Sequence, residues 1–183
     1  MKFIPENVYH VYNQGNNNQV VFSEELHFNY FLSLYKDYVG SFCETLAWCL
    51  MHTHFHFMIY TDERCLDIKK QGGLFLDPVT NGFGKLLSTY AHEYNIKNDR
   101  TGSLFRPKTK AVCLDDEVAL SKKYLLKQDY YLNTFNYIHN NPVEAGIVKN
   151  ASDWKWSSVR SYNGQGENSI CNKALAKQIC GLS

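Results

Sequence analysis

The chain has 183 residues, of which 44% are hydrophobic and 15% aromatic, and such a composition supports a folded core and excludes intrinsic disorder. Its 19 Lys and Arg residues nearly balance its 18 Asp and Glu residues, and the net charge of +1 does not by itself indicate a nucleic-acid-binding protein. The most apolar charge-free run, residues 45–61, is shorter than the roughly 20 residues that a membrane-spanning helix needs. We therefore expect one globular domain with no membrane span.

The first residues of the chain and its cysteines indicate the cellular compartment that we expect. Residues 1–6 contain no apolar segment of the kind found in signal peptides, which favours a cytoplasmic protein. The six cysteines form no CxxC pair, so we expect reduced and mostly buried thiols rather than a disulfide framework or a zinc knuckle.

The order of the predicted elements favours an α+β fold. In chain order we expect a strand at 8–13, a helix capped by Ser23 and ending near Gly40, strands at 42–50 and 54–60, a helix at 83–96, a short strand at 111–114 and a helix at 116–141. This order is typical of an antiparallel sheet with packed helices. We expect a single domain with its core at about 5–148, and an extension of the same core at 149–183.

A local excess of positive charge lies in the middle of the chain. Between positions 97 and 110, Asp99 is the acidic residue among Lys97, Arg100, Arg106, Lys108 and Lys110. These side chains could simply be solvated loop residues. Alternatively, they form a strip that binds phosphates, because local field rather than net charge decides such binding.

The segment at 52–60 (HTHFHFMIY) contains the most specific pattern. On a strand, His54 and His56 project from one face, about 6.6–7 Å apart along the chain, while the alternate residues enter the core. Two imidazoles on one face can share a divalent cation if a third ligand is supplied from elsewhere. Histidine pairs on strands can equally be structural and hydrogen-bonded, and the HExxH pattern of a zincin is absent.

A second pattern, at 137–142 (YIHNNP), lies at the end of the last predicted helix. Pro142 disfavours helical geometry at Asn141, so we expect the helix to end there. At 100° per residue, Asn141 lies about 40° from Tyr137, whereas Ile138 and the other apolar residues lie about 100° or more away. Tyr137 is therefore predicted to face away from the core, although most tyrosines in proteins serve packing.

Taken together, these patterns resemble the single-tyrosine HUH transposases, particularly the REP-associated tyrosine transposases of bacteria. The resemblance is carried by 8–13 (VYHVYN), 48–51 (WCLM) with 54–57 (HFHF), 100–107 (RTGSLFRP), 137–146 (YIHNNPVEAG) and 154–158 (WKWSS). Five motifs in the family order, from residue 8 to about 162, cover most of the chain.

The resemblance implies a ferredoxin-like or RNA-recognition-like antiparallel sheet with helices packed on one face. It further implies a nuclease and strand transferase that cuts single-stranded DNA beside an imperfect hairpin. Tyr137 matches the nucleophile, and His54, His56 and Asn141 match the ligands of a Mg²⁺ or Mn²⁺ ion. We then expect Arg100, Arg106, Lys108 and Lys110 to contact the DNA. We also expect a nucleoid-associated cytoplasmic protein, and the sequence does not decide whether it is a monomer or a homodimer.

The chain also departs from the family pattern. The family commonly has Pro-Asn where this chain has His52 and Thr53, so either the turn before His54 is altered or His52 is an extra ligand. Gln14 replaces a frequent arginine, and the segment 114–130 is longer than usual. Two alternative functions stay open: a hairpin-binding protein that no longer cuts, and a hydrolase that uses the histidine pair to activate water.

Overall fold

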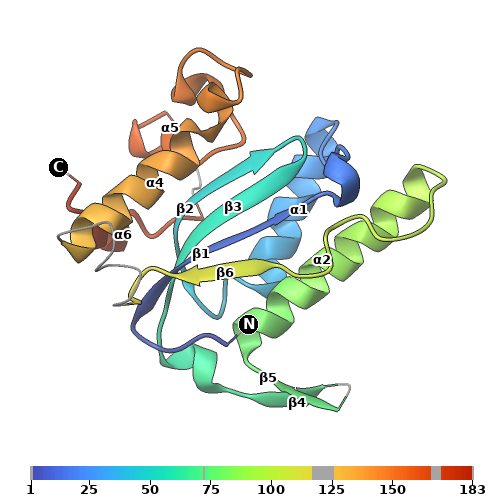
Figure 1. Ribbon diagram of the computed structural model, residues 1–183, viewed down its shortest axis with the longest axis horizontal. Helices are drawn as coiled ribbons and strands as arrows, with labels where there is room; N and C mark the ends of the chain where they lie inside the picture. Colours follow the sequence, from blue (N-terminus) through green and yellow to red (C-terminus); the bar gives the residue numbers. More distant parts are fainter. Residues whose placement is uncertain (1, 72, 117–125, 166–169, 183) are drawn as a thin grey trace.

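The computed structural model describes residues 2–71, 73–116, 126–165 and 170–182. Its central sheet has four antiparallel strands in the order β2-β3-β1-β6 (Figure 1). These are β1 (Asn7–Gln14), β2 (Glu44–Met51), β3 (His54–Thr61) and β6 (Lys110–Cys113). With α1 between β1 and β2 and α2 between β3 and β6, the chain follows the β-α-β-β-α-β order of a ferredoxin-like fold. The predicted α+β class and antiparallel sheet are confirmed.

Helices α1 (Glu25–Tyr38) and α2 (Pro78–Lys97) pack against each other and cover one face of this sheet. Helix α2 begins early because the Asp77 carboxylate accepts a hydrogen bond of 2.8 Å from the Thr80 N–H and Pro78 occupies the first turn. A β-carbon at Gly82 would overlap the Tyr38 carbonyl, so glycine allows α1 and α2 to approach closely.

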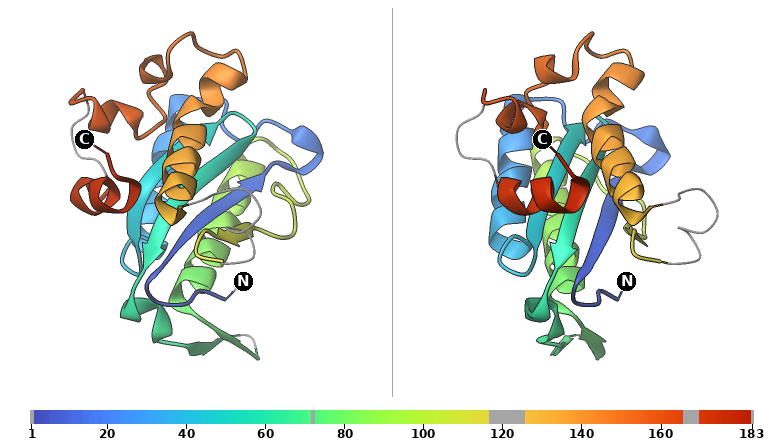
Figure 2. Two further views of the ribbon diagram at one scale, coloured as in Figure 1. Left: turned by 60° about the vertical axis from the view of Figure 1, so that its left-hand side comes forward. Right: turned by 90° about the vertical axis from the view of Figure 1, so that its left-hand side faces the viewer.

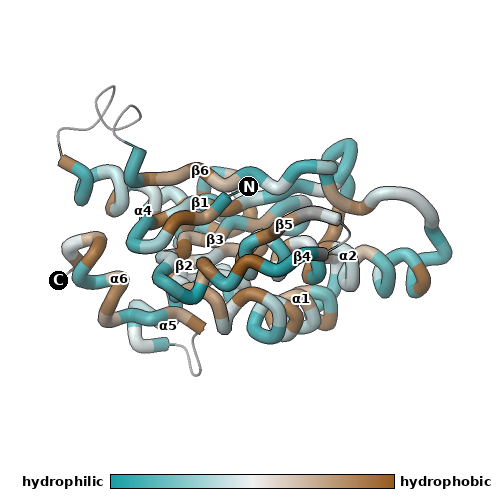
Figure 3. Tube along the Cα trace, turned by 90° about the horizontal axis from the view of Figure 1, so that it is seen from below, coloured by the Kyte–Doolittle hydropathy of each residue, from teal (hydrophilic) through white to brown (hydrophobic). Residues whose placement is uncertain are grey.

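The strands of the hairpin β2-β3 alternate as the sequence predicts. Phe55, Phe57 and Ile59 are fully buried against α1 and α2, and the residues between them face the other side. Figure 3 shows hydrophobic stretches recurring along the central strands. This alternation decides which side chains of β3 are available for a site.

The other face of the sheet is covered by α4 (Lys127–Glu144) and α6 (Lys173–Cys180), as Figure 2 shows. The prediction that the helices pack on one face is therefore wrong in this respect. The reason is that β2 is apolar on both sides, and β1 and β3 each add an apolar residue to the second face. Val8, Cys49 and Met58 form a second core with Phe135 and Ile138 of α4, and this surface needs a cover to be removed from water.

Helix α4 differs at both ends from the prediction of a helix at 116–141. Asp116 and Leu126 are not helical, the described helix begins at Lys127, and residues 117–125 lie outside the described part of the chain. Helix α4 also continues through Pro142 to Glu144, because proline lacks only its own N–H while the Asn141 carbonyl still accepts a bond from the Ala145 N–H.

The start of α4 is tied to the sheet through the buried carboxylate of Asp115. One of its oxygens accepts a hydrogen bond of 2.6 Å from the Val8 N–H, and the other accepts one of 2.6 Å from the Tyr131 hydroxyl. Lys127 forms an ion pair with the same carboxylate. Asp115 thus joins β1 to the first turns of α4.

The C-terminal extension packs along β2, which is an edge strand of the four-stranded sheet. The Leu50 N–H donates to the Trp156 carbonyl (2.8 Å), and the Trp154 indole N–H donates to the Leu50 carbonyl (2.9 Å). Its helices α5 (Val159–Tyr162) and α6, and the small hairpin of β4 (Lys69–Gln71) and β5 (Leu74–Leu76), were not predicted.

The cap of α1, the cysteines and the helix lengths bear on three further sequence predictions. Ser23 does not cap α1, since Glu24 is the N-cap residue and the Ser23 hydroxyl lies 3.1 Å from Nδ1 of His27. All six cysteines are free and four of them are buried, as expected. None of the described helices combines the length and apolar composition that crossing a membrane requires.

Candidate active site between the sheet and helix α4

His54 and His56 project from β3 toward α4. Strand β3 lies between β2 and β1, and Gln14 and Tyr12 of β1 are directly opposite the two histidines. The imidazole centroids are 5.0 Å apart with the ring planes at 86°. The two rings share one face of a central strand, as the alternation predicts, but this face is covered by α4, and His56 is only 5% exposed.

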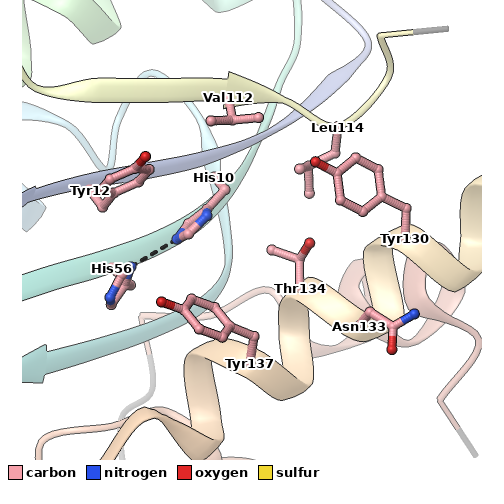
Figure 4. A pocket seen from close by; sticks show the side chains of 9 residues that line it. All are labelled: His10, Tyr12, His56, Val112, Leu114, Tyr130, Asn133, Thr134 and Tyr137. Atoms are coloured by element: carbon pink, nitrogen blue, oxygen red, sulfur yellow. Dashed lines mark hydrogen bonds between the residues drawn. The ribbon is translucent and has the colours of Figure 1, made fainter. Parts of the chain in front are cut away.

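Helix α4 brings Tyr137 onto this histidine pair. The Tyr137 ring lies 5.5 Å from the His56 ring, centroid to centroid, in an edge-to-face arrangement. The side chain is 43% exposed while the neighbouring Ile138 is fully buried, so the predicted orientation of Tyr137 away from the core is confirmed. Figure 4 shows the Tyr137 hydroxyl directed toward His56.

Asn141 lies one turn after Tyr137 on the same helix and contacts the other histidine. Its Oδ1 atom is 3.0 Å from Nε2 of His54, and its side chain is buried. On the far side of the His54 ring, Nδ1 lies 3.0 Å from the Thr53 hydroxyl oxygen. Continuation of the helix past Asn141 keeps this residue in register with Tyr137.

His10 of β1 is a member of the cluster that the sequence did not reveal. Its Nε2 atom lies 2.9 Å from Nδ1 of His56, and its ring centroid is 6.0 Å from that of Tyr137. The alternation of β1 places Tyr9 and Val11 in the α1/α2 core and thereby directs His10 to the opposite face. That signal was present in the sequence, but its contact with His56 depends on the register between β1 and β3.

A pocket of about 590 Å³ opens beside these side chains (Figure 4). Its lining consists of His10, Tyr12, His56, Val112, Leu114, Tyr130, Asn133, Thr134 and Tyr137. The volume lies within the range of roughly 300–1,000 Å³ that is usual for ligand sites. The lining combines aromatic rings, polar side chains and two aliphatic residues, so it suits a ligand with both flat and polar parts.

Burial keeps the three histidines of the cluster uncharged at neutral pH. Desolvation lowers the pKa of His10 to about 4 and the pKa of His56 well below its usual value. It also lowers the pKa of His54, against which the hydrogen bond to Asn141 acts in the raising direction. A neutral imidazole has the lone pair that a metal ligand needs.

His54, His56 and Asn141 are the candidate donors for a divalent ion at this site. Among the described residues, no three His, Cys, Asp or Glu side chains are placed to hold a metal, so a site here would need the Asn141 amide as a donor. Nε2 of His56 is buried and has no hydrogen-bond partner within the described part of the chain. Adjacent ligands of an octahedral ion at about 2.1 Å lie about 3.0 Å apart, close to the observed His54–Asn141 separation. The described residues therefore offer a divalent cation two imidazole nitrogens and one amide oxygen, and the cation would replace the hydrogen bond between His54 and Asn141.

The four predicted DNA-binding residues are not gathered in one strip. The Arg100 guanidinium donates to the side-chain oxygens of Asn95 (2.6 Å) and Gln19 (2.9 Å), so it holds a loop in place. Arg106 and Lys108 are exposed and line a groove of about 720 Å³ against α2. Lys110 is exposed and pairs with Tyr12, which places it on the face of the sheet that carries the histidines.

The two other histidines near these motifs have structural contacts. Nδ1 of His52 lies 2.7 Å from the Phe22 carbonyl oxygen, so it joins the β2-β3 turn to the segment before α1. Nε2 of His139 lies 2.7 Å from the Ser158 hydroxyl, and burial lowers the pKa of His139 to about 3. Neither contact involves the histidine pair.

The comparisons with known proteins support the fold. No protein-family model matches the chain, and no curated protein matches its sequence. The structure is similar to that of a REP-associated tyrosine transposase bound to a REP hairpin, with a TM-score of 0.59, and the match covers 93% of this chain and 87% of that chain. The sequence identity is 15%, so the likeness establishes a shared fold.

Proposed function

We propose that this protein is a metal-dependent single-stranded DNA endonuclease and strand transferase, and that it cuts beside a DNA hairpin through a covalent 5′-phosphotyrosine. The main support is the position of Tyr137, which faces His56 from α4 while Asn141, one turn later, contacts His54. The candidate nucleophile and the candidate donor residues thus lie together between β3 and α4, and Tyr137 and His56 line the same pocket.

In the proposed reaction Tyr137 attacks a phosphodiester. The tyrosine oxygen bonds to phosphorus, the bond from phosphorus to the leaving 3′-oxygen breaks, and the products are a 5′-phosphotyrosine and a free 3′-hydroxyl. Because Tyr137 is 43% exposed, its phenolic proton can pass to water. The phosphotyrosine keeps the energy of the bond, so a 3′-hydroxyl of another strand can reverse the step without a nucleotide cofactor.

The other residues of the site orient and neutralise the phosphate. A phenol with a pKa near 10 is a weak nucleophile at pH 7, so the phosphate charge must be offset and the attack aligned. A Mg²⁺ or Mn²⁺ ion held by His54, His56 and Asn141 would supply Lewis-acid stabilisation at a non-bridging oxygen. The neutral histidines could not supply that charge themselves.

A folded single strand is the substrate that best fits the surface. The similar transposase was solved with a REP hairpin. Here Arg106 and Lys108 are exposed in the groove beside α2, and Lys110 is exposed on β6 at the edge of the sheet. Exposed cations can contact phosphates, and the aromatic residues of the pocket can stack on unpaired bases.

The test is incubation of the protein with labelled hairpin DNA and Mn²⁺, followed by a denaturing gel. We expect a covalent adduct and a shortened DNA product. Cleavage without an adduct would instead support a hydrolase that activates water with the histidine pair. Hairpin binding without cleavage would support a protein that has lost the reaction.

A further inference from the structure

We propose that His10 is a positioning residue that holds His56 in the tautomer whose Nε2 lone pair faces the candidate metal site. This inference rests on the proposed function, because it concerns how the histidine pair is prepared to bind a cation. His10 is not itself a ligand in this scheme, and it acts through its hydrogen bond to His56.

The register of the sheet creates the contact between the two histidines. His56 lies directly opposite Tyr12, and His10 lies opposite Met58, so His10 and His56 are diagonal neighbours on one face. Diagonal neighbours in a sheet are within reach of aromatic side chains. Their rings stack with centroids 5.0 Å apart and planes at 27°, and Nε2 of His10 reaches Nδ1 of His56 at 2.9 Å.

A hydrogen bond between two neutral imidazoles contains one proton, and its location decides what His56 can do. If Nδ1 of His56 carries the proton, His10 accepts the bond and Nε2 of His56 has a free lone pair. If Nε2 of His10 carries it, His56 must be protonated at Nε2 and cannot ligate through that atom. Nε2 of His56 is buried without a partner in the described part of the chain, so the first arrangement leaves a lone pair rather than an orphaned donor directed at the site.

The second histidine of the pair also has a partner at Nδ1, but its Nε2 is engaged. Nδ1 of His54 is 3.0 Å from the Thr53 hydroxyl and can accept from it, while the Nε2–H donates to Oδ1 of Asn141 at 3.0 Å. A cation bound by His54 would replace this hydrogen bond, whereas Nε2 of His56 has no partner to give up in the described part of the chain. Such outer partners fix the ring orientation and the tautomer of metal-ligating histidines.

His10 also contacts the candidate nucleophile. Its ring meets the Tyr137 ring nearly edge-to-face, at a centroid distance of 6.0 Å and an interplanar angle of 75°. The Tyr137 ring thus packs on both His10 and His56, which are hydrogen-bonded to each other. One side chain of β1 thereby sets the orientation of His56 and supports the position of Tyr137.

Two variants of His10 distinguish its role as a hydrogen-bond acceptor for His56 from the packing of its side chain. His10→Gln keeps an acceptor oxygen for the Nδ1–H of His56, and His10→Leu removes it. His92→Leu, on an exposed position of α2, is the control for loss of a histidine. We expect His10→Leu to raise the Kd for Mn²⁺ by about 10- to 100-fold, His10→Gln to restore most of the affinity, and His92→Leu to leave it unchanged.

A second measurement needs neither metal nor activity. Nitrogen NMR of the metal-free wild-type protein should show the proton of His56 on Nδ1. A proton on Nε2 would overturn the proposal, as would wild-type Mn²⁺ affinity in His10→Leu, and both results can coexist with normal adduct formation at Tyr137. If wild type itself binds no Mn²⁺, both this role and the proposed metal-dependent function fail. If His10→Leu does not fold, the tautomer and the His10→Gln affinity still decide.

Discussion

Nε2 of His54 and Oδ1 of Asn141 lie 3.0 Å apart although 87 positions separate them in the chain. The contact joins a central strand to the last turns of α4, one turn beyond Tyr137. It therefore helps to set the distance between Tyr137 and the histidine pair, which depends on how α4 packs on the sheet.

Replacing Tyr137 with Phe should abolish covalent attachment to DNA. The variant loses one oxygen on an exposed side chain, so we expect hairpin affinity to change by less than about 3-fold, consistent with the small effect of most surface substitutions. Mass spectrometry of the trapped adduct gives the attachment site in wild type. Tyr130→Phe, which alters another tyrosine of the same pocket, should still form the adduct, and an adduct at Tyr130 would mean that Tyr137 is not the nucleophile.

Replacing Asn141 with Ala should weaken Mn²⁺ binding by about 10-fold or more, because one of three protein donors is lost. Asn141→Asp supplies a carboxylate oxygen at the same place and should bind Mn²⁺ at least as well as wild type. Calorimetric titration of the three proteins measures this order. Equal affinities for wild type and the Ala variant would exclude Asn141 as a ligand.

Acid should destabilise the folded protein below about pH 6.5. Burial lowers the pKa of His139 to about 3 and that of His10 to about 4, so the unfolded chain binds more protons between these values and 6.5. The stabilisation is complete above the unfolded pKa and is lost as the pH falls toward the folded pKa. The urea midpoint should fall steadily from pH 6.5 to pH 4.

His139→Gln tests which residue causes this dependence. The amide can still bond to Ser158 but does not titrate, so the slope of stability against pH should become shallower. At roughly 1.4 kcal/mol per pKa unit, the full contribution of His139 is on the order of several kcal/mol. An unchanged slope in the variant would place the acid sensitivity elsewhere.

Neutralising Arg106, Lys108 or Lys110 with Gln should weaken hairpin binding at all sequences. Each lost phosphate contact should reduce the slope of log affinity against log salt by about 0.7 on single-stranded DNA. Lys36 is exposed on α1 and lines neither the groove of Arg106 and Lys108 nor the pocket beside Tyr137, so Lys36→Gln is the matched control and should leave the slope unchanged. A triple variant with the wild-type slope would show that DNA binds at another surface.

Arg100→Gln should behave differently from the other three. Its guanidinium is engaged with Asn95 and Gln19, so the loss should appear as lower stability, by about 1 kcal/mol, with little change in the salt slope. Thermal unfolding and salt titration together separate these effects. A slope reduced by about 0.7 would restore Arg100 to the DNA-binding set.

Asp115→Ala should destabilise the protein by about 3 kcal/mol, because the buried Val8 N–H and Tyr131 hydroxyl lose a charged acceptor. Tyr131→Phe removes one of these two bonds and should cost about half as much. Denaturant unfolding of both variants measures the free energies. A change below about 0.5 kcal/mol for Asp115→Ala would show that the tether is dispensable.

The local patterns of the sequence were enough for the main strands and for the direction of individual side chains. Alternation in β3 placed His54 and His56 on one face, and the helical wheel of α4 turned Tyr137 away from Ile138. These properties depend on neighbours within a few residues, and a period of two or of 3.6 carries them directly.

What the sequence did not reveal depends on contacts between distant segments. The bond between His10 and His56 requires the register of β1 on β3, and the structural use of Arg100 requires Gln19 to lie beside it. The sequence did not predict helices on both faces of the sheet. The apolar segments of β2 and β3 indicate buried strands, but they do not indicate which elements cover them. Short elements such as β4 and β5 have too few residues for a period to show.

Tyr137 and Asn141 belong to one helix, so their contacts with the histidine pair are coupled. A rotation of α4 about its axis, or a slide by one turn of about 5.4 Å, would withdraw the tyrosine from His56 and the amide from His54 together. The geometry of the site therefore depends on how α4 is seated on the sheet, and Asp115, which accepts hydrogen bonds from Val8 and Tyr131, contributes to that seating.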